Sequence, residues 1–281
     1  MFRNAVVCTD LSSSSDGIVR CAEQLGVLGV RDAVLVHVIE LDRPASVPGP
    51  HDDALFERQT EELERAGIAV HVDTAVGYAP YEIERVAVEY GAGLIVAGNH
   101  GKGLFEGIMS GSVSSDLIRI AERPLLLTAP SSENDSEQVG TSCATMLAHV
   151  LFPSDPSDTS QHARRLMLAL AEKKPRAVTL LRVFAKRGTS GADHTVDDTH
   201  GQFTSFAEQL RDAGVGEVHL RILVGDPERV VSQAAASGEF SLVVMGPRCD
   251  EGSDSTLDSV TDITLQKTVV PVFLAPPRWQ P

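Results

Sequence analysis

The two halves of this 281-residue chain repeat one order of apolar runs and helical patterns. The stretch "VGDPERVVSQAAASGEFSLVVMG" at residues 224–246 matches "VGYAPYEIERVAVEYGAGLIVAG" at residues 76–98. In the same way, "FPSD" at residues 152–155 matches "VCTD" at residues 7–10. Such self-similarity indicates a duplicated unit, so the fold must be one that half of the chain forms twice.

Each half holds five short apolar runs separated by segments of helical periodicity. Aromatic residues make up only 5% of the chain, so the cores must consist mainly of Val, Leu, Ile and Ala, as in strands buried on both faces. Alternating strands and helices favour an α/β fold with parallel sheets. We therefore predict two tandem five-stranded, parallel, Rossmann-like domains of strand order 3-2-1-4-5. The first-half strands are expected at residues 5–9, 33–39, 68–76, 93–98 and 124–130, and the helices near residues 14–28, 50–66, 79–91 and 112–121.

A polar, acidic stretch, "SSENDSEQVGTS", separates the two copies and has the composition of a linker. It predicts a first domain at residues 1–130, a linker at 131–145 and a second domain at 146–281.

Composition excludes several classes of protein. The formal net charge of −15 disfavours nucleic-acid binding, which requires clustered Lys and Arg. No run approaches the roughly 18 apolar residues of a membrane span. A strand-like run begins almost at Met1, which leaves no room for a signal peptide, and a cytoplasmic protein is expected. The four cysteines show no CxxC spacing, so we expect free thiols in a reducing compartment.

A glycine-rich stretch, "VAGNHGKGLFEGIMSGSVSSDL" at residues 96–117, follows the fourth predicted strand and leads into a helix. Gly98 and Gly101 permit positive φ angles and close approach of the backbone to a ligand. The residues from Gly111 to Ser114 open the helix, whose unpaired N–H groups and dipole favour an anion. Neither a P-loop nor a GxGxxG fingerprint is present at the required place. The stretch predicts a phosphate cradle made of backbone groups, which an acidic chain tolerates.

In a doubly wound sheet, a ligand binds beyond the carboxyl ends of the strands where the strand order reverses, here between the first and fourth strands. Thr9 and Asp10 follow the first strand, and the glycine-rich stretch follows the fourth. This arrangement predicts a nucleotide whose base and ribose lie near Asp10 and Val38 and whose phosphates lie on the glycines.

The succession of strand, "TD", helix, "HVI", and G-x2-G-x9-G-S before a helix and a Pro-strand resembles the universal stress protein family over nearly the whole chain. The glycine pattern of the first unit is similar to that of the ATP-binding branch. Cys8 stands where that family often has proline. The resemblance implies ATP, with Mg2+ reached through its phosphates, and contacts from Cys8, Thr9, Asp10, Val38, Gly98, His100, Gly101, Gly111, Ser112, Val113 and Ser114. It also implies pairing of fifth strands, either within one chain as a pseudo-dimer or in a homodimer.

The second unit departs from this pattern. Gly246 is kept, and Ser259 and Thr261 match Ser112 and Ser114, but Arg248-Cys249 replaces the region of Gly101 and Asp258 replaces Gly111. A carboxylate at Asp258 repels phosphate, so weak or absent nucleotide binding is expected there.

Several alternatives stay open from the sequence. His100 is either a phosphate contact or a polar loop residue used through its backbone, and Asp10 is either a ligand contact or a helix cap. No HxH or HExxH spacing predicts a metal site, and no nucleophile–base set predicts a fast enzyme. The leading function is a nucleotide-binding stress-response regulator or sensor with unknown protein partners. The alternatives are a nucleotide-independent interaction protein and a slow ATPase or autophosphorylating protein.

Overall fold

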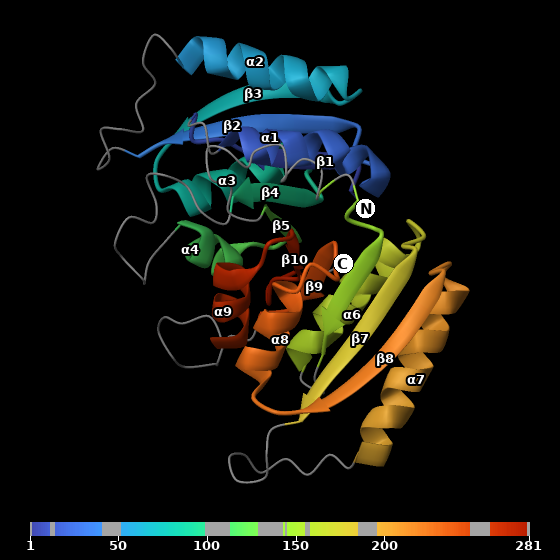
Figure 1. Ribbon diagram of the computed structural model, residues 1–281. Helices are drawn as coiled ribbons and strands as arrows, with labels where there is room; N and C mark the ends of the chain where they lie inside the picture. The colour runs from blue at the N-terminus through green and yellow to red at the C-terminus, as the bar shows by residue number, and fades with distance from the viewer. Residues whose placement is uncertain are drawn as a thin grey trace. The chain divides into compact units, whose positions relative to one another are not determined.

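A computed structural model of the chain describes residues 2–11, 15–40, 52–98, 113–128, 143, 145–154, 158–184, 196–247 and 259–279. The chain divides into two compact units, of which the first comprises residues 1–144 together with the segment that starts at Pro276. The second unit runs from Thr145 to Ala275 (Figure 1). Two tandem α/β units were predicted from the repeat, and this prediction is confirmed.

The first unit is a parallel sheet of order β3-β2-β1-β4-β5. This order confirms the predicted 3-2-1-4-5 arrangement. In chain order the elements are β1 (Asn4–Cys8), α1 (Ser15–Glu23), the 3-10 helix η1 (Gln24–Leu28), β2 (Asp32–Ile39), α2 (Asp52–Arg65), β3 (Ala69–Val76), α3 (Ala79–Glu89), β4 (Leu94–Gly98), α4 (Val113–Ile120) and β5 (Leu125–Thr128).

The second unit repeats this topology, with β6 at the centre of the order β10-β9-β6-β7-β8. Its elements are β6 (His149–Pro153), α6 (Asp158–Ala171), β7 (Ala177–Phe184), α7 (Val196–Asp212), β8 (Glu217–Val224), α8 (Pro227–Ala235), β9 (Leu242–Met245), α9 (Ser259–Lys267) and β10 (Val272–Leu274).

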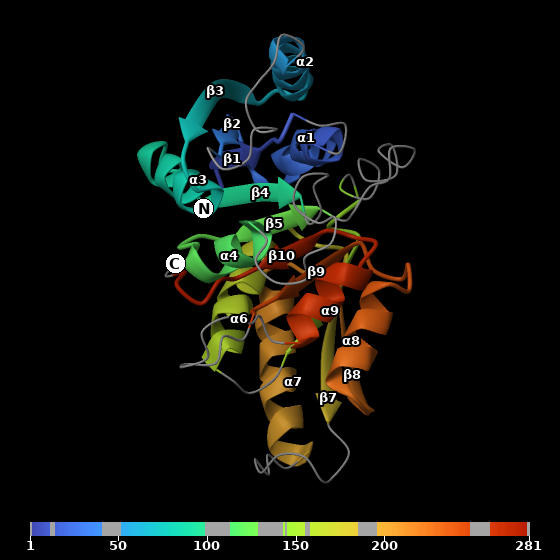
Figure 2. The ribbon, with the colours of Figure 1, turned by 90° about the vertical axis from the view of Figure 1, so that its left-hand side faces the viewer.

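Each sheet is covered by helices on both faces. In the first unit α1 packs beside α2 on one face, and α3 packs beside α4 on the other (Figure 2). In the second unit α6 and α7 share one face, while α8 and α9 share the opposite face. The central strands are therefore buried on both sides, which explains their continuous Val, Leu, Ile and Ala composition.

One glycine in each unit ends the helix that precedes the third strand. Gly67 has φ +82° and its N–H donates to the Glu64 carbonyl, and Gly214 has φ +110° and donates to the Arg211 carbonyl. A left-handed residue at this place satisfies the last helical carbonyls and costs little only for glycine. The two copies therefore keep the same helix end.

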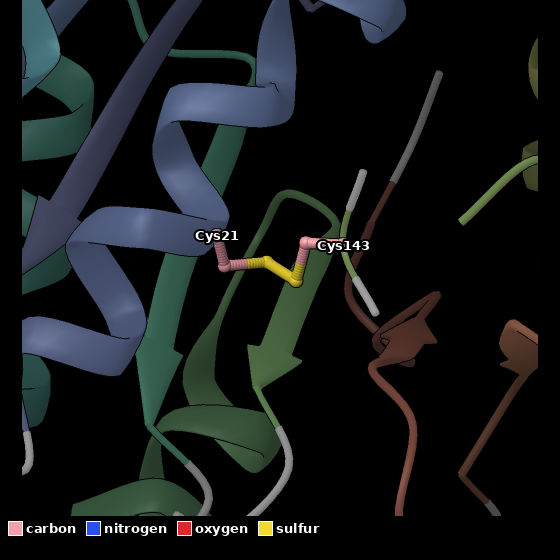
Figure 3. Close-up of a disulfide and its surroundings, with 2 residues drawn as sticks. All are labelled: Cys21 and Cys143. Carbon is pink, nitrogen blue, oxygen red and sulfur yellow. A yellow bond between two sulfur atoms is a disulfide. The ribbon is translucent and has the colours of Figure 1, made fainter. Parts of the chain in front are cut away.

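A disulfide joins Cys21 of α1 to Cys143, 122 residues further along the chain, and both residues are fully buried (Figure 3). The prediction that all cysteines are free thiols was wrong for this pair. The physical reason is that the folded backbone, and not local spacing, brings the two residues together. Cys8 is a free thiol, and Cys249 lies outside the described residues.

The disulfide closes a loop that contains most of the first unit. Cross-linking so long a loop removes much of the conformational entropy of the unfolded chain, and the stabilisation expected is about 2–5 kcal/mol. We predict that a Cys143→Ser variant unfolds in urea with a free energy lower by about this amount. Reductant should lower the stability of the native sequence to that of the variant and leave the variant unchanged.

The thiol count of the unfolded, unreduced protein provides the control. Two reactive thiols are expected, from Cys8 and Cys249, and four would contradict the disulfide.

Candidate functional site

The carboxyl ends of β1 and β4 lie side by side, because the two strands are hydrogen-bonded neighbours with Val7 opposite Val96. From β1 the chain continues to α1 on one face of the sheet, and after β4 it continues to α4 on the other face (Figure 2). This divergence is the switch point at which doubly wound sheets bind ligands. Thr9 and Asp10 follow β1, and Gly98 is the last residue of β4.

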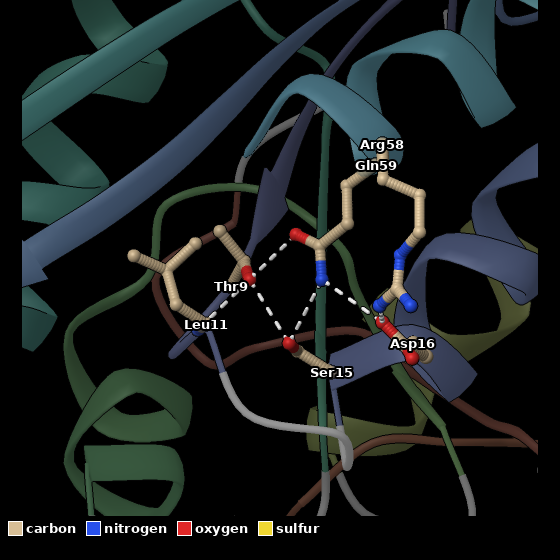
Figure 4. A network of polar contacts seen from close by, with 6 residues as sticks. All are labelled: Thr9, Leu11, Ser15, Asp16, Arg58 and Gln59. Carbon is tan, nitrogen blue, oxygen red and sulfur yellow. Dashed lines mark hydrogen bonds and ion pairs between the residues drawn. The ribbon is translucent and has the colours of Figure 1, made fainter. Parts of the chain in front are cut away.

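Thr9 lies at the centre of a buried polar network (Figure 4). Its hydroxyl is 2.9 Å from Gln59 Oε1 and 3.0 Å from Ser15 Oγ, and it accepts the Leu11 N–H at 3.1 Å. Gln59 Nε2 donates to Ser15 Oγ at 3.1 Å and to Asp16 Oδ1 at 3.2 Å. The network joins the end of β1 to the start of α1 and to the middle of α2.

The protons of this network can be assigned from chemistry. An amide oxygen only accepts, so the single Thr9 hydroxyl proton goes to Gln59 Oε1. Ser15 must therefore donate its proton to Thr9 Oγ1. The Gln59 amide then makes one accepted and two donated bonds, which explains how a fully buried glutamine is tolerated in a helix.

The backbone of Thr9 is also engaged. Its N–H donates to the Val36 carbonyl at 2.9 Å, and its carbonyl accepts from His37 Nδ1 at 3.0 Å. Because a carbonyl oxygen only accepts, this contact assigns a proton to Nδ1 of the buried His37 ring. Thr9 thus fixes the geometry of the strand end, whereas Asp10, the next residue, is exposed at the carboxyl end of the sheet.

Cys8 is a partly exposed residue with a neutral thiol. Burial raises the pKa of the Cys8 thiol to about 12. A thiol with so high a pKa stays protonated at physiological pH and is a poor nucleophile. Cys8 is consequently a neutral side chain and not a reactive group at physiological pH.

The end of β2 supplies Val38 and a buried carboxylate. Val38 is half-buried, as expected for a residue beside a ligand. Glu40 is 7% exposed, and its Oε1 accepts the Ala79 N–H at the start of α3 at 3.3 Å. A carboxylate at a helix start satisfies an unpaired N–H group and complements the dipole. Sequence reasoning missed Glu40, because an acidic residue after a strand gives no local signal of a cap on a later helix.

The other predicted site residues are described in part or not at all. Val113 and Ser114 are the first residues of α4, so the predicted helix start is present in the backbone. Outside the described residues lie His100, Gly101, Gly111 and Ser112 of the first unit and Asp155, Arg248, Cys249 and Asp258 of the second.

The second unit carries a different residue at the position of Gln59. Phe206 stands eight positions before Gly214, as Gln59 does before Gly67, so an aromatic ring replaces the buried amide. The Ser259 hydroxyl, which corresponds in sequence to Ser112, donates to the carboxylate of Glu228 at the start of α8. Within the described ranges, no group of three or more His, Cys, Asp or Glu residues is arranged to hold a metal ion. No helix among these residues is both long and apolar enough to cross a membrane.

The fold defines a tandem Rossmann-like protein whose first unit has its strand-order reversal between β1 and β4. A model of the universal stress protein family matches residues 1–129 and again residues 146–276. The chain belongs to the universal stress protein family, as two copies in tandem.

Known proteins agree with this assignment. Universal stress protein MJ0577 of Methanocaldococcus jannaschii is 30% identical over 103 residues, which are 37% of this chain and 62% of that relative. The match thus spans less than two thirds of the relative. A universal stress protein from Archaeoglobus fulgidus superposes with a TM-score of 0.70 at 20% identity, over 97% of this chain and 96% of its own. Protein PA1789 of Pseudomonas aeruginosa superposes with a TM-score of 0.61 at 16% identity, over 99% of this chain and 93% of its own. At such identities the two structures establish the fold alone.

Removing the buried amide tests the network. We predict that Gln59→Leu lowers the free energy of unfolding by about 1–3 kcal/mol, because buried hydrogen-bonding groups lose their partner. The neighbouring Arg58 contacts the same Asp16 carboxylate at 2.6 Å but is exposed, so Arg58→Leu should cost less than about 1 kcal/mol. Urea unfolding of both variants measures the difference, and equal losses would contradict a special role for Gln59.

The raised pKa of Cys8 predicts its reactivity. In native protein the rate of Cys8 alkylation by iodoacetamide should be very low at pH 8 and should rise about tenfold per pH unit up to pH 10. In unfolded protein the rate should level off near the ordinary thiol pKa. Peptide mapping by mass spectrometry measures both rates, and a native plateau below pH 9 would contradict the assignment.

Proposed function

We propose that the first unit binds ATP or a related adenine nucleotide and that the protein acts as a stress-response regulator or sensor. The observation that carries the proposal is the meeting of three features at one switch point. Thr9 and Asp10 follow β1, Gly98 ends the neighbouring β4 within the glycine-rich stretch, and α4 starts at Val113.

The chemistry of these groups suits a nucleotide. A ribose offers two hydroxyl donors, which the exposed Asp10 carboxylate is suited to accept. The base would lie against Val38 and the neutral Cys8, both of which present apolar surface. The phosphates would lie on the N–H groups at the start of α4 and on the glycine backbone, where helix dipoles favour negative charge. This assignment of contacts extends to His100, Gly101, Gly111, Ser112, Val113 and Ser114 as a proposal.

The second unit is proposed to hold no nucleotide. Asp258 replaces Gly111 in sequence, and Ser259 already donates its hydroxyl to Glu228. Both changes place carboxylates where phosphate requires donors. The domain limits of 1–130 and 146–281, a dimeric or pseudo-dimeric assembly and a cytoplasmic location remain predictions.

A substitution that copies the second unit into the first tests the proposal. Gly111→Asp should weaken ATP binding by at least about tenfold, since a like charge in the cradle costs on the order of 1.4 kcal/mol or more. Isothermal titration with ATP, ADP and AMP provides the measurement, together with assay of adenine nucleotide released on denaturing the purified protein.

Gly201→Asp is the matched control for this experiment. Gly201 is an exposed residue of α7 with open space around its Cα, so the substitution adds the same charge without a clash. It should leave ATP affinity within about twofold of the native value. Absence of ATP binding by the native protein, or equal loss in both variants, would overturn the proposal.

A further inference from the structure

Two arginines of the second unit are half-buried. They are Arg182 of β7 and Arg164 of α6. Within the part of the chain that the structure describes, neither guanidinium forms an ion pair, although the chain carries 39 acidic residues against 24 basic ones. Arg182 Nε is buried without a hydrogen-bond partner. An unpaired buried donor of this kind requires an explanation, and an unobserved ion is one of the few available.

Both arginines face the same layer. Phe152 of β6 pairs with Leu180 of β7, and the Phe152 ring lies 5.5 Å from that of Phe206 on α7. Arg182 is two residues after Leu180 and therefore points to the same face of the sheet. The Arg164 guanidinium lies 4.4 Å from the Phe206 ring, so the two cations share the face covered by α6 and α7.

Aromatic rings hold the guanidinium groups in place. Arg182 lies 4.9 Å from the centroid of Phe184, and Arg164 lies over Phe206. Such stacking fixes the plane of the cation and leaves its N–H edge available to an acceptor. Burial lowers the pKa of both groups, but arginine starts so high that both remain charged at neutral pH.

The first unit carries other residues at the positions of both arginines. Leu180 pairs with Phe152 in the second sheet, as Leu35 pairs with Val7 in the first, so the two leucines correspond. Arg182 follows Leu180 by two positions and therefore corresponds to His37. Arg164 follows Ser154 by ten positions, as the fully buried Val19 follows Thr9. A half-buried cation without a neighbouring anion lowers the stability of the folded protein, so two such cations on one face of the sheet favour a bound anionic ligand.

We propose that the second unit binds a small oxyanion, a phosphate or carboxylate group, at Arg182 near the carboxyl end of β7, on the face of the sheet that Arg164 shares. The unpaired Arg182 Nε and its neighbouring N–H groups donate to the oxygens, in the two-point manner that guanidinium offers to planar or tetrahedral oxyanions. Arg164 supplies the second charge. This site differs from the proposed nucleotide site in its unit, its residues and its use of side chains in place of backbone.

Titration with simple anions tests the proposal. The full-length protein carrying Gly111→Asp is titrated with inorganic phosphate and, in a second arm, with acetate, so that phosphate binding by the first unit is weakened in every variant compared. Arg182→Gln and Arg164→Gln should each weaken binding of the preferred anion at least tenfold. Arg165→Gln, which removes an exposed charge from the adjacent position of α6, should change it less than twofold. Binding of neither anion, or equal weakening in the control, would overturn the proposal.

A second variant separates binding from folding. Arg182→Met keeps the length of the side chain and removes its charge. Without anion its Tm should equal or exceed that of the parent, because an unpaired half-buried charge is removed, and the Tm rise with phosphate or acetate should vanish. A lower Tm with the anion response intact would show that Arg182 is structural, and would contradict the proposal. Neither result depends on whether the first unit binds ATP.

Discussion

The hydrogen bond from Thr9 to Gln59 holds together the region on which the proposed site depends. β1 ends at this point, and the chain must turn toward α1 while leaving its carboxyl end open. The buried Gln59 amide anchors Thr9 and Ser15 to α2, and the His37 ring fixes the Thr9 carbonyl. With all polar groups of Thr9 occupied, the strand end is set in one conformation and Asp10 is presented beyond it. A rigid wall of this kind reduces the entropy lost when a ligand is positioned.

The duplication separates what the fold needs from what the site needs. Both copies keep the strand order and the helix-ending glycines Gly67 and Gly214, because each sheet requires them. The residue at the position of Gln59 differs between the copies, because Phe206 replaces it in the second. Among the described residues, Arg182 and Arg164 of the second copy form no ion pair. The copies therefore share a scaffold and present different chemistry at equivalent strand ends.

Most of the fold could be predicted from the sequence, because short apolar runs and helical periodicity are local signals. The strands expected at 33–39 and 68–76 agree with β2 and β3 within one residue. The disulfide could not be predicted, since Cys21 and Cys143 meet only in the folded unit. From the sequence, Gln59 cannot be distinguished from an ordinary polar helix residue, because its burial depends on the packing of α2 against α1. The site could be located from "TD" and the glycines, but the inward turn of the Thr9 hydroxyl depends on contacts made across 50 residues.

The central claim is that one chain holds one nucleotide, in its first unit. Native mass spectrometry of the full-length protein in excess ATP measures this stoichiometry directly. The account predicts one adenine nucleotide per native chain, and a lower occupancy in the Gly111→Asp variant when ATP is held near the native Kd. Two nucleotides per chain, or equal occupancy of both proteins at that concentration, would contradict it.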